Sequence, residues 1–94
     1  MVVTVQEVKT HLRIQYDDED VYLDTLIRQS QAAAQDYCRV TFDDDPPEPV
    51  RLAVLLMVSF LYENRDLPDK HVYLTTRMAF ENLLYPYRDL DLMF

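Results

Sequence analysis

The side chains with the most chemical potential are few and scattered in this chain of 94 residues. His11 and His71 are the only histidines, and neither belongs to a cluster of histidine, cysteine and glutamate typical of a zinc site. Cys38 is the single cysteine, which rules out an internal disulfide, and after a run of alanines it is expected to be a small buried thiol. Ser30 and Ser59 lie on apolar stretches without a nearby base. The sequence therefore predicts no catalytic residue and no enzyme.

Carboxylates, in contrast, are concentrated in two short blocks that contain no basic residue. Together these blocks account for the formal net charge of −8, because acids and bases nearly balance in the rest of the chain. Their oxygens could hold a divalent cation, but acids at the start of a helix more often cap it and face solvent, so we expect no metal and no cofactor. The first block contains Asp17, Asp18, Glu19, Asp20 and Asp24, and the second contains Asp43, Asp44, Asp45 and Glu48.

The absence of glycine excludes several classes of protein. Phosphate loops, dinucleotide-binding fingerprints and the nucleophile elbow of hydrolases need glycine where the backbone turns tightly or approaches a ligand. The EF-hand calcium loop needs one for its sharp turn, and tight hairpins commonly use one as well. The chain is therefore expected to be mainly helical.

Charge and length also limit the surroundings of the protein. The sequence shows no basic face for binding duplex DNA. It shows neither an N-terminal signal segment nor an apolar stretch long enough to span a membrane. With a single cysteine, these features predict synthesis in a reducing cytoplasm and no membrane contact.

The elements that position these residues are expected to be about four helices, forming one domain over residues 1–94 with long loops between them. Thr4 and Glu7 form a capping box, in which each side chain bonds to the backbone amide of the other residue. The first helix follows this box and runs to about Leu12.

A second helix is expected after Asp17 or Asp18, whose side chain would cap it, and it runs to about Tyr37. A polar linker then leads to a third helix that begins near Pro49, because proline is tolerated in a first turn. This helix ends near Asn64, which is expected to take the left-handed conformation usually left to glycine.

The third helix is the one around which we expect the bundle to form. Between residues 52 and 62 every residue except Ser59 is apolar, so the helix has no polar face and should be buried by neighbours. Val54 and Val58 would also suit a strand, but the segment is long for one. So short a chain has few helices to cover it, and a second copy of the protein is expected to cover part of its surface.

The last part of the chain is expected to hold a loop at 65–74 and a final helix capped by Thr75 or Thr76 and ended by Pro86. A tail follows, with apolar residues that have no evident place in a small core. Such residues often mark a contact with a partner, although an unbound tail is the alternative. They are Leu90, Leu92, Met93 and Phe94.

Three stretches, in this order, resemble the small head–tail connector (adaptor) proteins of tailed phages and prophages. Residues 4–14 read TVQEVKTHLRI and lead into the acids at 17–20 and a long helix. Residues 49–65 resemble the family's central helix and its Tyr-Glu-Asn-Arg ending. Residues 83–88 read LLYPYR, similar to the family's closing motif. The chain departs from the family at Cys38-Arg39-Val40, where a Thr-Gly-Arg turn is common, and in a longer segment over 69–81.

The resemblance implies a structural virion protein at the head–tail junction. Such a subunit would assemble with itself into a ring of roughly a dozen copies beneath the portal protein, and bind a further connector or tail protein. DNA would pass through the ring without specific binding, because acidic residues repel phosphates.

Two sets of residues are candidates for these roles. The expected contacts with other copies or partners, which would also hold the helix ends, are Tyr62, Asn64, Arg65, Tyr87, Arg88, Leu92 and Phe94. The expected acidic lining of the DNA channel is Asp17, Asp18, Glu19, Asp20, Asp43, Asp44 and Asp45. A simple surface pairing of Arg65 and Arg88 with nearby acids is the alternative for those two residues.

Two other classes of function remain open. A small acidic protein can mimic DNA and inhibit a basic partner, in which case the acidic blocks would imitate phosphates. A metal-assisted enzyme would instead be stabilised by Mg²⁺ or Mn²⁺. The oligomeric state separates the connector from both of these.

Overall fold

The computed structural model describes residues 1–64 and 70–89. Within these ranges the chain forms four α-helices and one short 3-10 helix, and no strand is found there. The expected mainly α-helical bundle of about four helices is therefore confirmed. The elements are α1 (Val5–Leu12), α2 (Asp20–Cys38), α3 (Glu48–Glu63), α4 (Lys70–Leu84) and η1 (Tyr85–Tyr87).

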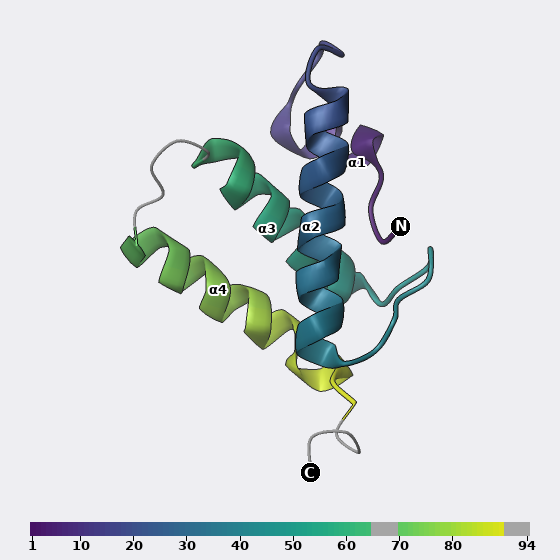
Figure 1. Ribbon diagram of the computed structural model, residues 1–94, viewed down its shortest axis with the longest axis vertical. Coiled ribbons are helices and arrows are strands. Elements are labelled where there is room, and N and C mark those ends of the chain that lie inside the picture. Colours follow the sequence, from purple (N-terminus) through teal and green to yellow (C-terminus); the bar gives the residue numbers. More distant parts are fainter. Residues whose placement is uncertain (65–69, 90–94) are drawn as a thin grey trace.

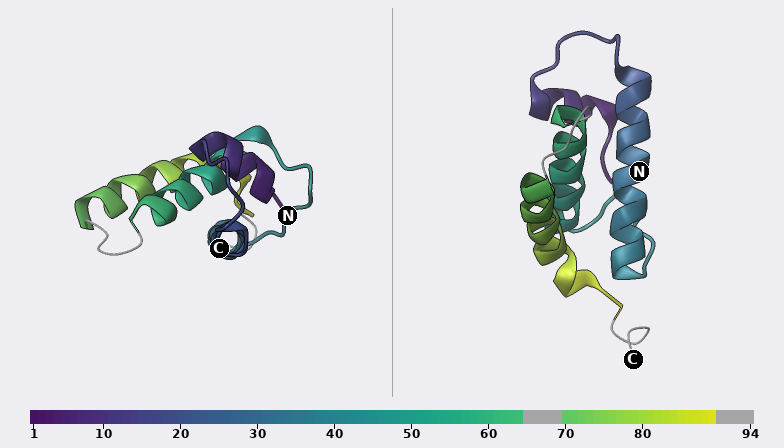
Figure 2. Two further views of the ribbon diagram at one scale, coloured as in Figure 1. Left: turned by 90° about the horizontal axis from the view of Figure 1, so that it is seen from above. Right: turned by 60° about the vertical axis from the view of Figure 1, so that its left-hand side comes forward.

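The helices are arranged around α3. In Figure 1, α2 stands upright, α3 lies beside and behind it, and α4 leaves the base of α2 at an angle. Viewed from above in Figure 2, α4 runs back along α3 while α1 lies across the other side of α3. The result is a slab with principal extents of 45 × 31 × 17 Å.

The capping box predicted for α1 is present. The Thr4 hydroxyl accepts a hydrogen bond from the Glu7 amide at 3.1 Å, and the Glu7 carboxylate accepts one from the Thr4 amide at 3.2 Å. The helix ends at Arg13, which is left-handed with φ 62°, and α2 ends in the same way at Arg39 with φ 60°. Because the chain has no glycine, arginine occupies both of these C-caps.

The left-handed cap expected at Asn64 is wrong. Asn64 has φ −122° and ψ 39°, and it closes α3 in another way. Its backbone amide and its side-chain amide both donate to the carbonyl oxygen of Phe60 at 3.0 Å. The side chain thus supplies the hydrogen bond that makes a left-handed turn unnecessary here.

The predicted aspartate cap of α2 is also wrong. The residue before α2 is Glu19, and its side chain makes no capping bond. The carboxylate of Asp17 is instead engaged by Lys9 of α1. Asp17, which the local sequence predicted as a cap, is thus bound by a residue of another helix.

The core forms where α2, α3 and α4 meet, and the central position expected for α3 is confirmed. Seven residues of α3 are buried: Val50, Ala53, Val54, Leu55, Met57, Val58 and Phe60. Between residues 52 and 62 only Leu52 is exposed, and the others are buried or half-buried. Helices α1, α2 and α4 of the same chain cover most of α3. The expectation that a second copy covers part of its surface stays a prediction, and the exposed Leu52 is where it applies.

Helix α4 begins earlier than predicted. It starts at Lys70, so Thr75 and Thr76 lie inside the helix and do not cap it. The Thr75 hydroxyl donates to the carbonyl oxygen of His71 at 3.0 Å, a bond between successive turns. Residues 70–74 of the expected loop at 65–74 are therefore helical, and residues 65–69 lie outside the described residues. The helix ends at Leu84, and Pro86 lies in η1, close to the predicted end.

Candidate functional site

Most carboxylates of the first acidic block make polar contacts within the fold, although Asp17 is itself exposed. The ammonium group of Lys9, a residue only 6 % exposed, contacts Asp17 and lies 3.0 Å from the carboxylate of Asp20. Hydrogen bonds to Asp17 and then Asp20 raise the pKa of Lys9. Asp18 is exposed. This block was predicted from the sequence, but its counter-ion comes from α1 and was not.

Glu19 of the same block ties the start of α2 to the end of α3. The Tyr62 hydroxyl donates to its carboxylate at 2.7 Å, and the Tyr16 hydroxyl lies 3.3 Å from the same oxygen. Hydrogen bonding with Tyr16 and Glu19 raises the pKa of Tyr62. The ring of Tyr62 also stacks against Tyr22, with centroids 6.4 Å apart. Tyr62 therefore holds a helix end.

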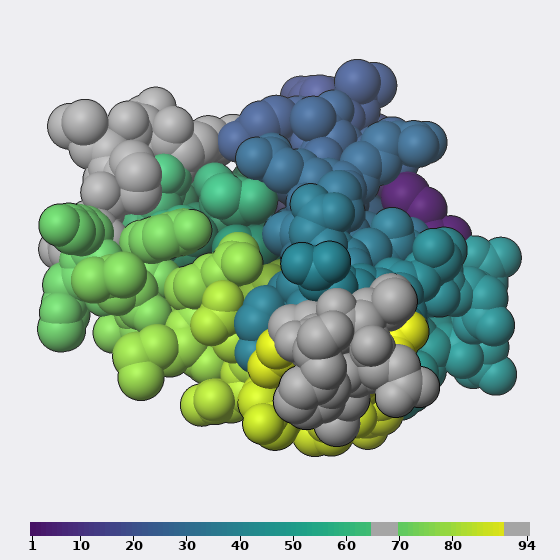
Figure 3. Space-filling view, turned by 60° about the horizontal axis from the view of Figure 1, so that its bottom comes forward, coloured from purple at the N-terminus to yellow at the C-terminus, as the bar shows by residue number. Residues whose placement is uncertain are grey.

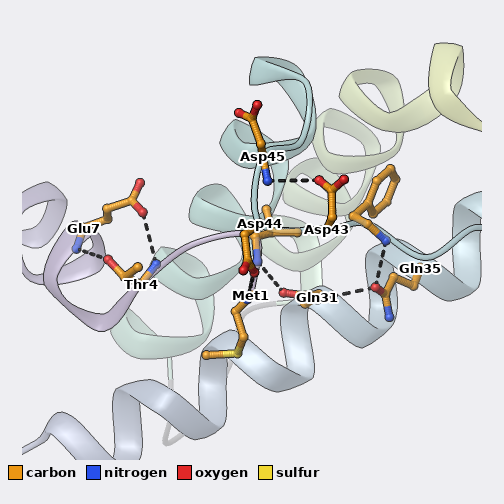
Figure 4. Close-up of polar contacts among 10 residues, drawn as sticks. Met1, Thr4, Glu7, Gln31, Gln35, Asp43, Asp44 and Asp45 are labelled. Carbon is orange, nitrogen blue, oxygen red and sulfur yellow. Dashed lines mark hydrogen bonds and ion pairs between the residues drawn. The ribbon is translucent and has the colours of Figure 1, made fainter.

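The second acidic block forms an exposed turn between α2 and α3 (Figure 4). The carboxylate of Asp43 accepts a hydrogen bond from the Asp45 amide at 3.0 Å. The carboxylate of Asp44 pairs with the amino group of Met1, and this hydrogen bond lowers the pKa of Asp44. All three aspartates are exposed, so this block presents its charge to the surroundings.

Two glutamines of α2 fix the segments on either side of that turn. Gln31 accepts a hydrogen bond from the Val2 amide at 2.7 Å, and Gln35 accepts one from the Phe42 amide at 3.1 Å (Figure 4). The two acidic blocks do not form one cluster. The first contacts α1 and α3, and the second contacts the N-terminal segment.

Residues 85–89 contact the carboxyl-terminal end of α2. The guanidinium of Arg88 lies 5.1 Å from the ring centroid of Tyr37 and 5.2 Å from that of Tyr85. The Asp89 amide donates to the carbonyl oxygen of Cys38 at 2.8 Å. Cys38 is fully buried, as expected, and its burial raises the pKa of the thiol. Arg88 therefore fastens the segment after η1 to α2 through its cation–π contact with Tyr37.

The remaining candidates of that set have different outcomes. Asn64 holds the end of α3, and Tyr87 is half-buried against the core. Arg65, Leu92 and Phe94 lie outside the described residues.

The structure also presents an apolar surface that sequence reasoning missed. Helix α4 exposes Val72, Tyr73 and Leu74 in its amino-terminal half and Met78 just past its middle, with Met78 exposed by 66 %. Only Phe80 and Leu84 of this helix are buried. In Figure 3 this half of α4 (green) projects away from α2 (blue). The run Val72-Tyr73-Leu74 is visible in the sequence, but its exposure follows only once it is helical.

A small opening lies between this projecting helix and α2. It has a volume of about 140 Å³, and its walls include Ser30, Ala33, Leu61, Tyr73 and Arg77. The Ser30 hydroxyl is fully buried, and no hydrogen-bond partner for it is found among the described residues. The opening marks the place where α4 diverges from α2.

Comparison with known families decides among the functional classes. A sequence model described as phage gp6-like head-tail connector protein matches residues 2–90. The chain belongs to this connector family. Searches of curated proteins and of solved structures returned no match.

As a head–tail connector, the protein belongs to a structural family of the phage particle, and the resemblance drawn from the three sequence stretches is confirmed. In the part of the chain that the structure describes, no group of three or more histidine, cysteine or acidic residues is placed to hold a metal ion. None of its described helices is long and apolar enough to cross a membrane.

Proposed function

We propose that this connector forms a homo-oligomeric ring, of roughly a dozen copies, that docks under the portal protein and forms part of the DNA channel between capsid and tail. Its lower surface would receive a further connector or a tail protein. Assembly would take place in the host cytoplasm before the protein becomes part of the virion. The observation that carries this proposal is the family match over residues 2–90.

The exposed apolar surface of α4 supports self-assembly. Contiguous exposed apolar side chains on a soluble domain commonly mark a protein contact. The core is covered by the chain itself, and Leu74 and Met78 remain exposed on one side of α4, where another subunit would contact them.

For the channel lining, the second acidic block is the stronger candidate. Asp43, Asp44 and Asp45 are all exposed, and within the described residues only Asp44 of these has an ion pair, with the amino group of Met1. In the first block the exposed Asp17 and the half-buried Asp20 share the ammonium group of Lys9. A ring of exposed aspartates, repeated from copy to copy, would repel the phosphate backbone and let DNA move without adhering. The same pairing with Lys9 argues against a DNA mimic, because the first block presents no row of free negative charges.

Native mass spectrometry and electron microscopy of the purified protein, alone and with the portal protein of the same phage, test the proposal. A closed ring that binds the portal is the expected result. A protein that stays monomeric with the portal present, at any concentration, would contradict it. A ring with residues 43–45 on its outer rim would contradict the channel assignment alone.

A further inference from the structure

We propose that the contact between neighbouring copies is formed by the outer face of α2 from one copy and the side of α4 from the next. This inference rests on the proposed ring and names the surfaces that build it. Six residues carry it: Val21, Asp24 and Arg28 on α2, and Leu74, Arg77 and Glu81 on α4.

Both helices leave an aliphatic residue exposed at one end of this surface. Val21 is 84 % exposed and Leu74 is 49 % exposed. Val21 lies nine residues before Ser30, which at 100° per residue places it on the opposite side of α2 from the core. Its exposure follows from this position, because within residues 1–64 and 70–89 the core of the protein lies on the other side of α2.

Each helix also carries one ion pair between residues four apart. On α2, the guanidinium of Arg28 lies 2.8 Å from the carboxylate of Asp24. On α4, the guanidinium of Arg77 lies 3.0 Å from the carboxylate of Glu81. The order of charge is opposite, since the acid comes first on α2 and the base comes first on α4.

The spacing of the two sets is identical. In each helix the aliphatic residue is followed by a charge three positions later and the opposite charge seven positions later. Two parallel helices side by side would therefore bring Val21 against Leu74, Asp24 against Arg77, and Arg28 against Glu81, over about 10 Å of helix. The four charges would alternate in sign, which is the arrangement that complementary interfaces use.

Symmetric pairings of the same helices fit less well. An antiparallel pair of α4 helices that matches Arg77 with Glu81 sets Leu74 against Leu84, which is buried in its own core. An antiparallel pair of α2 helices that matches Asp24 with Arg28 sets Val21 against the polar Gln31. Only the pairing of α2 with α4 brings two exposed aliphatic residues together.

This contact joins two different surfaces of the same chain, so it is head-to-tail. Each copy that offers its α2 face still has its α4 face available, and the contact repeats until a ring closes.

Cross-linking between introduced cysteines tests the contact directly. The double variant Val21→Cys/Leu74→Cys, treated with a short bis-maleimide, is expected to give a ladder of dimers, trimers and larger products. The native Cys38 is fully buried and should not react. On a denaturing gel, a mixture of the two single variants should stop at the one-to-one dimer, and each single variant alone should give no cross-linked product.

A double variant that gives no cross-linked product would overturn the contact. So would a single variant that cross-links to itself as well as the double variant does. The matched control is Val21→Cys/Leu52→Cys, because Leu52 is also an exposed leucine, at 45 %, but lies on α3. It is expected to give no ladder.

Exchanging the charges within each helix tests the register. Asp24→Arg/Arg28→Asp and Arg77→Glu/Glu81→Arg each keep the net charge and the ion pair within the helix, but each sets like charges against each other across the contact. Either exchange should lower the yield of Val21–Leu74 cross-links about tenfold or more, and both exchanges together should restore it. An unchanged yield, or a loss that the combined exchange does not reverse, would contradict the register.

The two proposals fail in different ways. Closed rings of the unmodified protein without any Val21–Leu74 cross-link would overturn this contact and leave the ring proposal standing. A cross-linked ladder with no limiting size, and open filaments in electron micrographs, would confirm the contact and contradict the ring.

Discussion

Helices α3 and α4 are neighbours of nearly equal length, with 16 and 15 residues, but they use their apolar side chains differently. α3 buries seven residues among three other helices, whereas α4 buries two in its carboxyl-terminal part and exposes four large apolar residues from Val72 to Met78. The comparison shows that apolar content alone does not indicate an assembly surface. The segment that looks too apolar for a small protein is its core, and the less apolar helix is available to a partner.

Placing a negative charge on α3 and on α4 should give the largest difference in stability between the two helices. Val58→Asp buries an unpaired carboxylate in α3, at a fully buried position, and is expected to cost about 4 kcal/mol or more of folding free energy. The matched change Met78→Asp, on the exposed face of α4, should alter it by less than about 0.5 kcal/mol. Urea unfolding followed by circular dichroism measures both, and equal losses would contradict the comparison.

The two ends of α4 should also differ from each other. Phe80→Ala removes a fully buried ring at the base of the helix and is expected to cost about 3–5 kcal/mol. Tyr73→Ala removes a half-exposed ring whose centroid lies 5.7 Å from that of Phe60, and should cost about 1 kcal/mol. The amides near Tyr73 should exchange with deuterium faster than those near Phe80. Uniform protection along α4 would show that its amino-terminal half is as firmly held as its base.

The end of α3 offers a smaller effect. Asn64→Ala removes the side-chain hydrogen bond to the carbonyl oxygen of Phe60, and is expected to cost about 0.5–1.5 kcal/mol. Asn64→Gly should not recover this loss, because Asn64 is not left-handed in the native structure. Thermal unfolding of the two variants measures the difference, and a glycine variant as stable as the native protein would favour the left-handed cap.

The smallest predicted effect is a loss of stability at alkaline pH. The pKa values of Lys9 and Tyr62 are raised in the folded protein from their ordinary values of 10.5 and 10.0. Both groups therefore stabilise the fold fully below about pH 10, and this stabilisation is lost as the pH rises through their folded pKa values. Melting temperature should fall above pH 10, less steeply for Lys9→Gln and for Tyr62→Phe than for the native protein. Identical slopes would show that neither contact is linked to folding.

Much of the fold follows from local sequence patterns. The capping box of Thr4 and Glu7, the proline start of α3 and its apolar run are all local, and they fixed α1 and α3 to within a residue or two. The start of α4 was missed because Val72-Tyr73-Leu74 lacks the polar spacing of a surface helix. Helical structure there exposes apolar side chains that a search for buried faces does not expect.

The candidate site was less accessible to prediction, for a physical reason. The acidic blocks are visible in the sequence, but whether a carboxylate is free depends on which cation the fold brings to it. Lys9 reaches Asp17 and Asp20 from another helix, and no local spacing indicates that contact. The charge pairs Asp24–Arg28 and Arg77–Glu81 are local, but the sequence alone does not show how far the fold leaves each pair exposed.

The left-handed arginines that end α1 and α2 lower the stability of the protein. A side chain with a β-carbon held in the left-handed region costs roughly 1 kcal/mol relative to the same turn made by glycine, and the chain bears that strain twice, at Arg13 and Arg39. The native connector is therefore less stable than its backbone conformation permits. Replacing Arg13 and Arg39 by glycine would raise the free energy of unfolding without changing the core or either acidic block.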